Sequence, residues 1–461
     1  MSTSQCSHNL LPFSKNENVL IGERAVNAVV LEADPVETGT VVANLIREGR
    51  FAELEELFAP RLSTVVSADT VRSGWATALA GTGPVTAIGQ PETRPGPEDG
   101  LVRVIVPVAC ARGALAVHLT VDDAGLLHGL RLAPPETASW VPPRYAAGRR
   151  FAEQEVTVGS GPLAVPGTVT LPRARGRGRW PGVVLLSGGG PFDRDAAYGV
   201  NKPLKDLAWG LASRGIAVLR FDKVTFTHAA VTEDPGFTMT DEYVPHATAA
   251  VRLLQRQPGV DPARVFVLGH SMGGKVAPRV ASAEPSVAGL VLLAADAQPM
   301  QRAAVRVMRY LASLNPGPEA DAAVAAAARH AALVDGPGLT AATPASELPF
   351  GYSAAYWLDL RGYDPVGAAA ALDKPMLILQ GGRDYQVTVE DDLARWRSGL
   401  TDGPDVTIRV HDADNHLFFP GTSQSTPADY DPPQHVDPAV IDDIARWLVP
   451  RRGFLARLRL R

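Results

Sequence analysis

The chain has 461 residues, of which 46% are hydrophobic and 20% are charged, and its formal net charge is −5. This composition is typical of globular proteins and excludes a disordered or fibrous chain. Only six of the 44 basic residues are lysine, four of them between residues 202 and 275. The negative net charge argues against a nucleic-acid partner.

The two cysteines, Cys6 and Cys110, provide neither a disulfide framework nor a thiolate metal site. The first residues lack the basic and apolar regions of a signal peptide. No stretch approaches the roughly 18 uncharged apolar residues that span a membrane. We therefore expect a soluble, cytoplasmic protein without a membrane partner, and the sequence leaves a homodimer open.

Residues 1–34 are aperiodic and predict a flexible leader. The next segment, 35–135, shows helical spacing followed by alternating β runs, which indicates a small α+β domain. Residues 136–165 follow as a linker and first strands. The elements expected in the small domain are helices at Val41–Phe58 and 70–80, and strands at Val85–Ile88, Leu101–Pro107, Ala114–Thr120 and near His128–Leu132.

Between 166 and 450, short apolar strands alternate with helices, a pattern typical of an α/β domain with a mostly parallel sheet. An Ala-rich helical block at about 297–365 interrupts the alternation and predicts a cap at the ligand-binding edge of the sheet. A short basic tail, 451–461, ends the chain. The expected strands are Gly182–Leu186, Gly215–Phe221, Val265–Leu268, Gly289–Ala294, Pro375–Gln380 and Val406–Val410, and the helices are 202–213, 241–257, 273–283, 390–399 and 438–448.

The strongest chemical signal is VFVLGHSMGGKV, at 265–276. Gly269 to Gly273 fit G-x-S-x-G between a strand and a helix, which is the nucleophile elbow. Small residues two before and two after Ser271 let the backbone turn tightly and expose the hydroxyl. The amide of Met272 would then face a developing oxyanion.

The same stretch also fits a phosphate-binding loop, G-x-x-x-x-G-K, that ends at Lys275. Asp296, at the end of a hydrophobic strand, could then be the acidic residue of a Walker B element. Such a loop needs Ser or Thr at the next position to hold magnesium, and here the residue is Val276. The NTPase interpretation is therefore weaker than the elbow. A glycine-rich turn without any chemistry is the third alternative.

In the elbow architecture, an acid and a histidine follow the serine along the chain. Asp384 follows the strand that ends at Gln380, and His416 follows the strand that ends at Val410. We expect His416 to take the proton of Ser271, and Asp384 to orient the imidazole. The rival bases are His411 and His435, the rival acid is Asp296, and the HDADNH run at 411–416 leaves a metal site as a weaker alternative.

A second oxyanion donor normally comes from the loop after an early strand. The glycines at 188–190 suit this role because their amides can approach a substrate. Gly189 is the preferred donor and Gly190 the next. Asp193 and Arg194 are expected to order this loop as an ion pair.

These residues resemble those of bacterial α/β-hydrolase-fold serine hydrolases of the esterase and dienelactone-hydrolase-like group, in the branch with an N-terminal cystatin-like α+β domain. The resemblance implies triad roles for Ser271, Asp384 and His416. Such proteins usually carry His where this chain has Ser187. The motifs behind the resemblance are WVPPRY (140–145), SGGGPFDRD (187–195), NKPLKDLA (201–208), FDK (221–223), GHSMGG (269–274), YWLDL (356–360), GGRDYQV (381–387) and NHLF (415–418).

The sequence thus predicts a serine hydrolase that cleaves a carboxylic ester or thioester of a small molecule through an acyl-enzyme, with no cofactor and no metal. Tyr356 and Trp357 are expected to line the acyl pocket, with a purely structural role in the cap as the alternative. An acyltransferase or cyclase would use the same acyl-enzyme, because exclusion of water by the cap decides the outcome. A non-catalytic binding module would lack a triad member, and none is missing.

Overall fold

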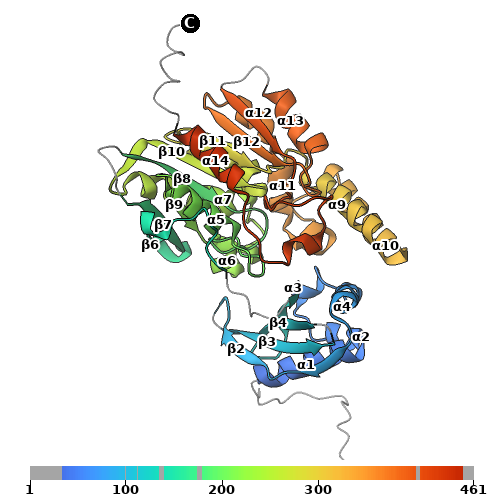
Figure 1. The fold of residues 1–461 in the computed structure, drawn as a ribbon. Coiled ribbons are helices and arrows are strands. Elements are labelled where there is room, and N and C mark those ends of the chain that lie inside the picture. Colours follow the sequence, from blue (N-terminus) through green and yellow to red (C-terminus); the bar gives the residue numbers. More distant parts are fainter. Residues whose placement is uncertain are drawn as a thin grey trace, which may run out of the picture.

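The structure is a computed structural model that describes residues 34–98, 100–111, 113–133, 140–173, 179–400 and 405–449. Two domains follow one another along the chain, the smaller one drawn below the larger one in Figure 1. The predicted leader, apart from residue 34, and the basic tail lie outside the described residues, as do the end of the predicted small domain and the start of the linker, at 134–139.

The N-terminal domain packs helices on one face of an antiparallel sheet with the order β1-β3-β4-β5, in which β2 also pairs with β3. Valine and leucine side chains of β3 and β4 face α1 and α4 and form a separate hydrophobic core. The elements are α1 (Pro35–Glu48), α2 (Phe51–Glu55), α3 (Pro60–Ser63), α4 (Ala68–Thr82), β1 (Val85–Ile88), β2 (Glu92–Pro95), β3 (Leu101–Cys110), β4 (Gly113–Asp122) and β5 (Leu127–Ala133).

Two details of this domain differ from the sequence prediction. The single helix expected at Val41–Phe58 is divided into α1 and α2, because Gly49 adopts a left-handed φ of 74° and its amide caps α1. Strand β2 was not predicted. All four of its residues are exposed, so the apolar alternation that marks a half-buried strand is absent.

The larger domain contains an eight-stranded sheet with the order β13-β12-β11-β10-β8-β9-β7-β6. The strands from β13 to β9 are parallel, whereas β7 and β6 are antiparallel to their neighbours. The carboxyl ends of the parallel strands therefore meet at one edge. The strands are β6 (Phe151–Val158), β7 (Val165–Pro172), β8 (Trp180–Leu186), β9 (Ala217–Phe221), β10 (Val260–His270), β11 (Leu290–Leu293), β12 (Met376–Gly381) and β13 (Val406–His411).

Helices cover both faces of this sheet. Side chains of α5 and α14 join the core on one face, and those of α7, α8, α12 and α13 join the core on the other. In the described part of the chain, no helix meets the length and apolarity needed to cross a bilayer. The helices are α5 (Pro203–Ala212), α6 (Val224–Thr227), α7 (Met239–Gln255), α8 (Met272–Ala283), α12 (Pro365–Ala370), α13 (Ala394–Gly399) and α14 (Pro438–Leu448).

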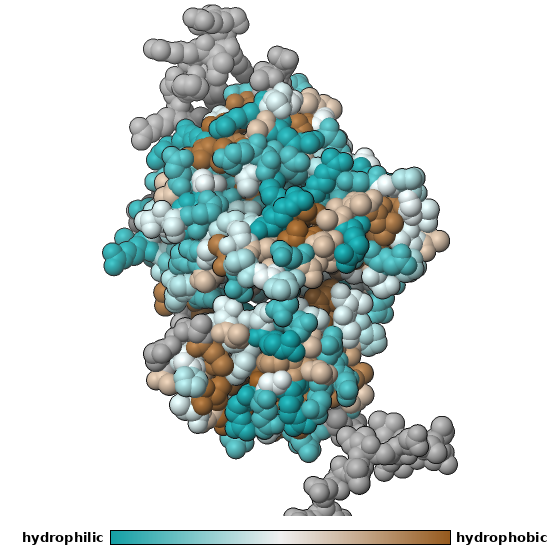
Figure 2. All heavy atoms as spheres, turned by 90° about the vertical axis from the view of Figure 1, so that its right-hand side faces the viewer, coloured by the Kyte–Doolittle hydropathy of each residue, from teal (hydrophilic) through white to brown (hydrophobic). Residues whose placement is uncertain are grey.

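The segment between β11 and β12 forms the predicted helical insertion. It contains α9 (Met300–Leu314), α10 (Pro318–Asp335) and α11 (Ala354–Arg361). Helices α9 and α10 pack on each other and project at the right of Figure 1. In Figure 2 this side faces the viewer, and the N-terminal domain adjoins the larger domain below it.

Candidate active site

Ser271 lies at the sharp turn between β10 and α8. Its φ of 54° and ψ of −122° are a conformation that side-chain-bearing residues rarely adopt. Its amide donates to the carbonyl oxygen of Leu293 in β11 at 2.9 Å, which fixes the turn to the edge of the sheet. The side chain therefore projects from a rigid, strained turn, as the G-x-S-x-G pattern predicts.

The two glycines of the motif are required by close backbone contacts. A Cβ atom on Gly269 would lie 2.1 Å from the carbonyl oxygen of Gly273. A Cβ atom on Gly273 would lie 2.5 Å from the carbonyl oxygen of Ser187 and 2.6 Å from that of Leu186. Because both contacts are with backbone atoms, a larger residue at either position would displace the turn or the glycine loop.

The structure brings His416 and Asp384 together. Asp384 follows β12 and His416 follows β13, and both are buried. The His416 Nδ1 atom lies 2.7 Å from Asp384 Oδ2. An ionised carboxylate only accepts, so this ring nitrogen donates and leaves Nε2 as the acceptor.

Backbone amides hold the Asp384 carboxylate in place. Oδ1 accepts hydrogen bonds from the amides of Gln386 at 2.7 Å and Val387 at 3.0 Å, and Oδ2 accepts one from Gln380 Nε2 at 3.2 Å. Burial opposes protonation of His416, but the Asp384 carboxylate outweighs it and raises the pKa of His416 above its ordinary value. The pair thus stabilises the imidazolium that forms once His416 takes up a proton.

His270, which precedes the serine, contacts both the backbone and the ring of His416. Its Nε2 atom lies 2.8 Å from the carbonyl oxygen of His416, and the two ring centres are 4.7 Å apart. Burial, together with the charge of His416, lowers the pKa of His270 to about 3. His270 is therefore neutral and donates to that carbonyl. The sequence analysis did not assign it a role.

The rival residues contact other partners. Asp296 is paired with Lys275 inside the domain, and the two other histidines are each paired with an acid away from the cavity. The distances are 3.1 Å for Lys275 to Asp296, 3.5 Å for His411 to Asp443 and 3.1 Å for His435 to Asp206. Lys275 is thus a buried ion-pair partner at the start of α8.

The glycine loop approaches the elbow closely. A Cβ atom on Gly188 would lie 3.2 Å from the Cβ of Ser271, and one on Gly189 would lie 3.5 Å from the Met272 side chain. In the described residues, neither the Gly189 nor the Met272 amide donates to a carbonyl oxygen. Both amides are available at the amino end of α8, where partial positive charge favours an anion.

A buried polar network holds this loop from behind. The Lys223 ammonium donates to the Gly188 carbonyl at 3.0 Å and to the Tyr243 hydroxyl at 2.9 Å, and it pairs with Glu242 at 2.7 Å. The Tyr243 hydroxyl in turn donates to the Gly188 carbonyl at 2.7 Å. Burial lowers the pKa of Lys223, which the Glu242 carboxylate opposes.

The sequence analysis missed this network. Its members come from the end of β9 and from α7, so no local motif joins them. The only signals were the FDK run and a lysine in a chain that otherwise uses arginine. Ser187 replaces the usual histidine. Its carbonyl oxygen belongs to the same network and lies 3.2 Å from the Tyr243 hydroxyl.

The elbow, the glycine loop and His416 line one cavity of about 520 Å³. Its remaining wall is mainly apolar, and the cap contributes α9 together with Phe350 and Tyr352. Asp296 also lines it. The apolar lining residues include Phe192, Ala196, Met300, Ala303, Ala304, Val307, Val387 and Leu417.

The expectation that Tyr356 and Trp357 line the acyl pocket is not met. Both belong to α11 and are only 2% and 0% exposed, and neither is among the cavity residues. The Tyr356 hydroxyl donates to Glu242, and the Trp357 indole donates to the carbonyl oxygen of Pro349. Both rings belong to the hydrophobic core that α11 shares with α7 and α8, and the loop before α11 supplies the lining aromatics instead.

The expected ion pair between Asp193 and Arg194 is also absent. Arg194 pairs with Asp222 at 2.9 Å and with Glu155, whereas Asp193 accepts the amides of Asp195 and Ala197. No group of three or more His, Cys, Asp or Glu residues in the described ranges is placed to hold a metal ion.

Comparison with known proteins shows the family to which the chain belongs. Residues 202–397 match the family model described as serine aminopeptidase, S33. The chain is 37% identical to Esterase EstD of Thermotoga maritima over 339 residues, which cover 73% of this chain and 77% of that esterase. The chain belongs to the serine hydrolases of the α/β-hydrolase fold.

The hydrolase is also similar to solved structures at low identity. Est1E from Butyrivibrio proteoclasticus is 12% identical, with a TM-score of 0.41, and the match covers 64% of this chain and 97% of that one. A putative dienelactone hydrolase from Klebsiella pneumoniae is 16% identical, with a TM-score of 0.39 and coverage of 65% and 99%. The predicted family and fold class are confirmed by the family model and the EstD match.

Proposed function

We propose that this hydrolase cleaves a carboxylic ester or thioester through an acyl-enzyme formed on Ser271. One observation carries the proposal: Ser271 sits with a φ of 54° in the same cavity as His416, whose Nδ1 lies 2.7 Å from Asp384. Esterase EstD, at 37% identity, supports the same class of reaction. The apolar cavity suits an apolar acyl group.

The residues have distinct roles in the proposed reaction. The Ser271 oxygen attacks the substrate carbonyl carbon while His416 Nε2 takes the hydroxyl proton. The amides of Met272 and Gly189, with Gly190 beside them, stabilise the oxyanion. His416 then gives the proton to the departing alcohol or thiol, and the acyl group remains on Ser271.

Water completes the cycle. His416 removes a proton from a water molecule, the hydroxide attacks the acyl carbon, and the protonated imidazole returns the proton to the Ser271 oxygen. Asp384 stays ionised and stabilises the imidazolium in both halves. The products are a carboxylic acid and the alcohol or thiol, and no cofactor is consumed.

Labelling with a fluorophosphonate probe tests the nucleophile, because the serine oxygen displaces fluoride and becomes phosphonylated. We expect the wild-type chain and Ser282→Ala to be labelled and to hydrolyse p-nitrophenyl butyrate, and Ser271→Ala to do neither. Ser282 is a matched control because it lies on α8 and its hydroxyl only donates to the Pro278 carbonyl oxygen. An unlabelled wild-type chain would refute the proposal.

A further inference from the structure

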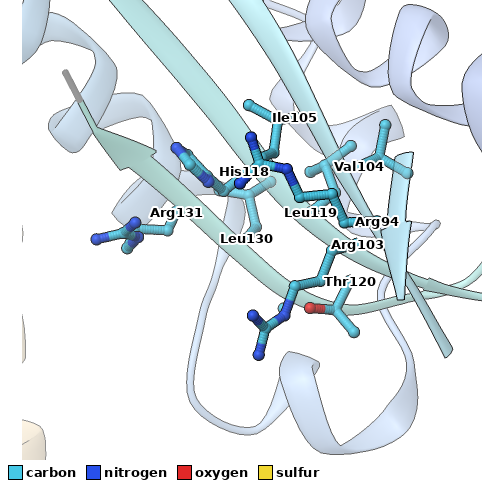
Figure 3. A pocket seen from close by; sticks show the side chains of 10 residues that line it. Arg94, Arg103, Val104, Ile105, His118, Leu119, Thr120, Leu130 and Arg131 are labelled. Atoms are coloured by element: carbon cyan, nitrogen blue, oxygen red, sulfur yellow. The ribbon is translucent and has the colours of Figure 1, made fainter. Parts of the chain in front are cut away.

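A pocket of about 360 Å³ on the N-terminal domain gathers basic side chains from four strands. Arg94 of β2 lies opposite Arg103 of β3, and Arg103 lies opposite Thr120 of β4. His118 of β4 lies opposite Arg131 of β5. Arg103, His118 and Arg131 alternate with core residues of their own strands, so they share the face turned away from α1 and α4, and Arg94 joins this face through its pairing with Arg103. Figure 3 shows these side chains around the pocket.

The charged side chains that line this arginine pocket are all basic. Arg94 lies 3.8 Å from Glu92, and both of these side chains are at least half exposed. Neither Arg103 nor Arg131 forms a salt bridge within the described ranges. In a chain with a net charge of −5, several guanidinium groups around one hollow make a local site for an anion.

One member of the arginine pocket, Arg131, acts electrostatically on residues at the catalytic cavity. Burial raises the pKa of Tyr198 and that of Asp431, and in both cases the charge of Arg131 opposes the rise, so Arg131 is near both. Tyr198 lines the catalytic cavity, as does Tyr430, the neighbour of Asp431. The β5 end of the pocket thus lies within electrostatic reach of the rim of the cavity.

A second contact joins the N-terminal domain to the rim. A Cβ atom on Gly351 would lie 3.2 Å from the Thr64 hydroxyl of the N-terminal domain. Gly351 stands between Phe350 and Tyr352, which both line the catalytic cavity. The small domain therefore adjoins the loop that supplies Phe350 and Tyr352 to the cavity wall.

We propose that the arginine pocket binds an anionic group, a phosphate or a carboxylate, on the alcohol or thiol portion of the substrate. The inference rests on the proposed esterase or thioesterase function. The catalytic cavity is largely apolar, and an anion loses too much solvation to enter such a site without a partner. Guanidinium groups offer paired N–H donors that match phosphate and carboxylate oxygens.

The experiment compares three butyryl substrates: phenyl butyrate, 4-carboxyphenyl butyrate and butyryl-coenzyme A. All three share the butyryl group. Their leaving groups carry, in the order given, no charge, a carboxylate and phosphates. The variants are Arg103→Gln and Arg131→Gln, with Arg256→Gln as the matched control, since Arg256 is an exposed arginine at the end of α7. Steady-state kcat and KM are measured for each combination of variant and substrate.

We expect each pocket variant to raise KM for at least one anionic substrate about tenfold, which is ~1.4 kcal/mol, and to leave phenyl butyrate unchanged. The substrate that responds distinguishes phosphate from carboxylate. Raised ionic strength should increase the same KM in the wild type but not in the variants. Equal KM changes for neutral and anionic substrates, or none, would overturn the proposal while hydrolysis of phenyl butyrate still upheld the esterase function.

Discussion

Tyr243→Phe tests whether the buried network behind the glycine loop sets the activity of the enzyme. The substitution removes a hydroxyl that accepts from Lys223 at 2.9 Å and donates to the Gly188 carbonyl at 2.7 Å. Tyr243 and Lys223 are each only 3% exposed, so water does not replace the lost partner. The ring stays, so the change creates no large cavity.

The magnitude follows from the bonds lost. A hydrogen bond to a charged group contributes about 1.5–3 kcal/mol, and here the Lys223 ammonium loses one of its three acceptors. We therefore expect the free energy of unfolding to fall by about 2 kcal/mol. Loss of a complete oxyanion donor costs about 10²–10³ in kcat. Because Lys223 still holds the Gly188 carbonyl, we expect kcat to fall about tenfold, with KM little changed.

The assay is hydrolysis of p-nitrophenyl butyrate together with urea unfolding. Tyr145→Phe is the matched control, since the Tyr145 hydroxyl is buried without a hydrogen-bond partner among the described residues, and its removal should leave kcat unchanged. If Tyr243→Phe lost stability but kept kcat within about twofold of the wild type, the network would not position the oxyanion loop, and this reasoning would be refuted.

Three further predictions concern buried charges. Asp384 outweighs burial and raises the pKa of His416 above 6.5, so kcat/KM of the wild type should fall as the pH drops through a midpoint above 6.5. In a pH–rate profile, Asp384→Asn should lower both that midpoint and kcat. Burial and then Asp437 raise the pKa of Asp414 to about 8. The folded chain therefore keeps a proton that the unfolded chain loses above about pH 4, so the free energy of unfolding falls as the pH rises toward 8. Urea unfolding at pH 5 and pH 8 should show this fall in the wild type and not in Asp414→Asn. Lys275→Met leaves Asp296 unpaired and should lower the free energy of unfolding by about 3–5 kcal/mol, part of which Asp296→Asn restores in the double variant.

Each of these has a contrary outcome. An acidic midpoint that stays the same in Asp384→Asn would mean that another group controls the acidic limb. A wild-type stability that does not decline between pH 5 and 8 would contradict a protonated Asp414. If Asp296→Asn did not improve the stability of Lys275→Met, the loss would come from packing and not from the unpaired carboxylate.

The sequence predicted the arrangement around Ser271 well because the relevant contacts are encoded locally. The elbow needs glycines at two fixed positions, and Gly269 and Gly273 both lie against backbone atoms. Parallel strands bring their following loops to one edge, so Asp384 and His416 could be placed from strand order alone. Their hydrogen bond then depends only on two short loops.

Other features depend on contacts that no local pattern records. Glu242 and Tyr243 lie on consecutive positions of α7, where helical spacing predicts only a buried face. Their partners, Lys223 and the Gly188 carbonyl, come from loops after two different strands. Tyr356 was misassigned for a related reason, since burial of a cap aromatic does not indicate which side of the cap faces the substrate.

Lys223 shows why lysine, which is rare in this chain, is used at a buried position. Its ammonium donates toward a carbonyl, a hydroxyl and a carboxylate, which together use all three N–H groups of a compact tetrahedral donor. A planar guanidinium presents five donors in one plane and needs more room, so arginine would leave buried donors unmatched here. Lys275, also buried, meets a carboxylate and a backbone carbonyl in the same manner. In these two places the geometry of the acceptors around the glycine loop and the elbow explains the choice of lysine better than charge alone.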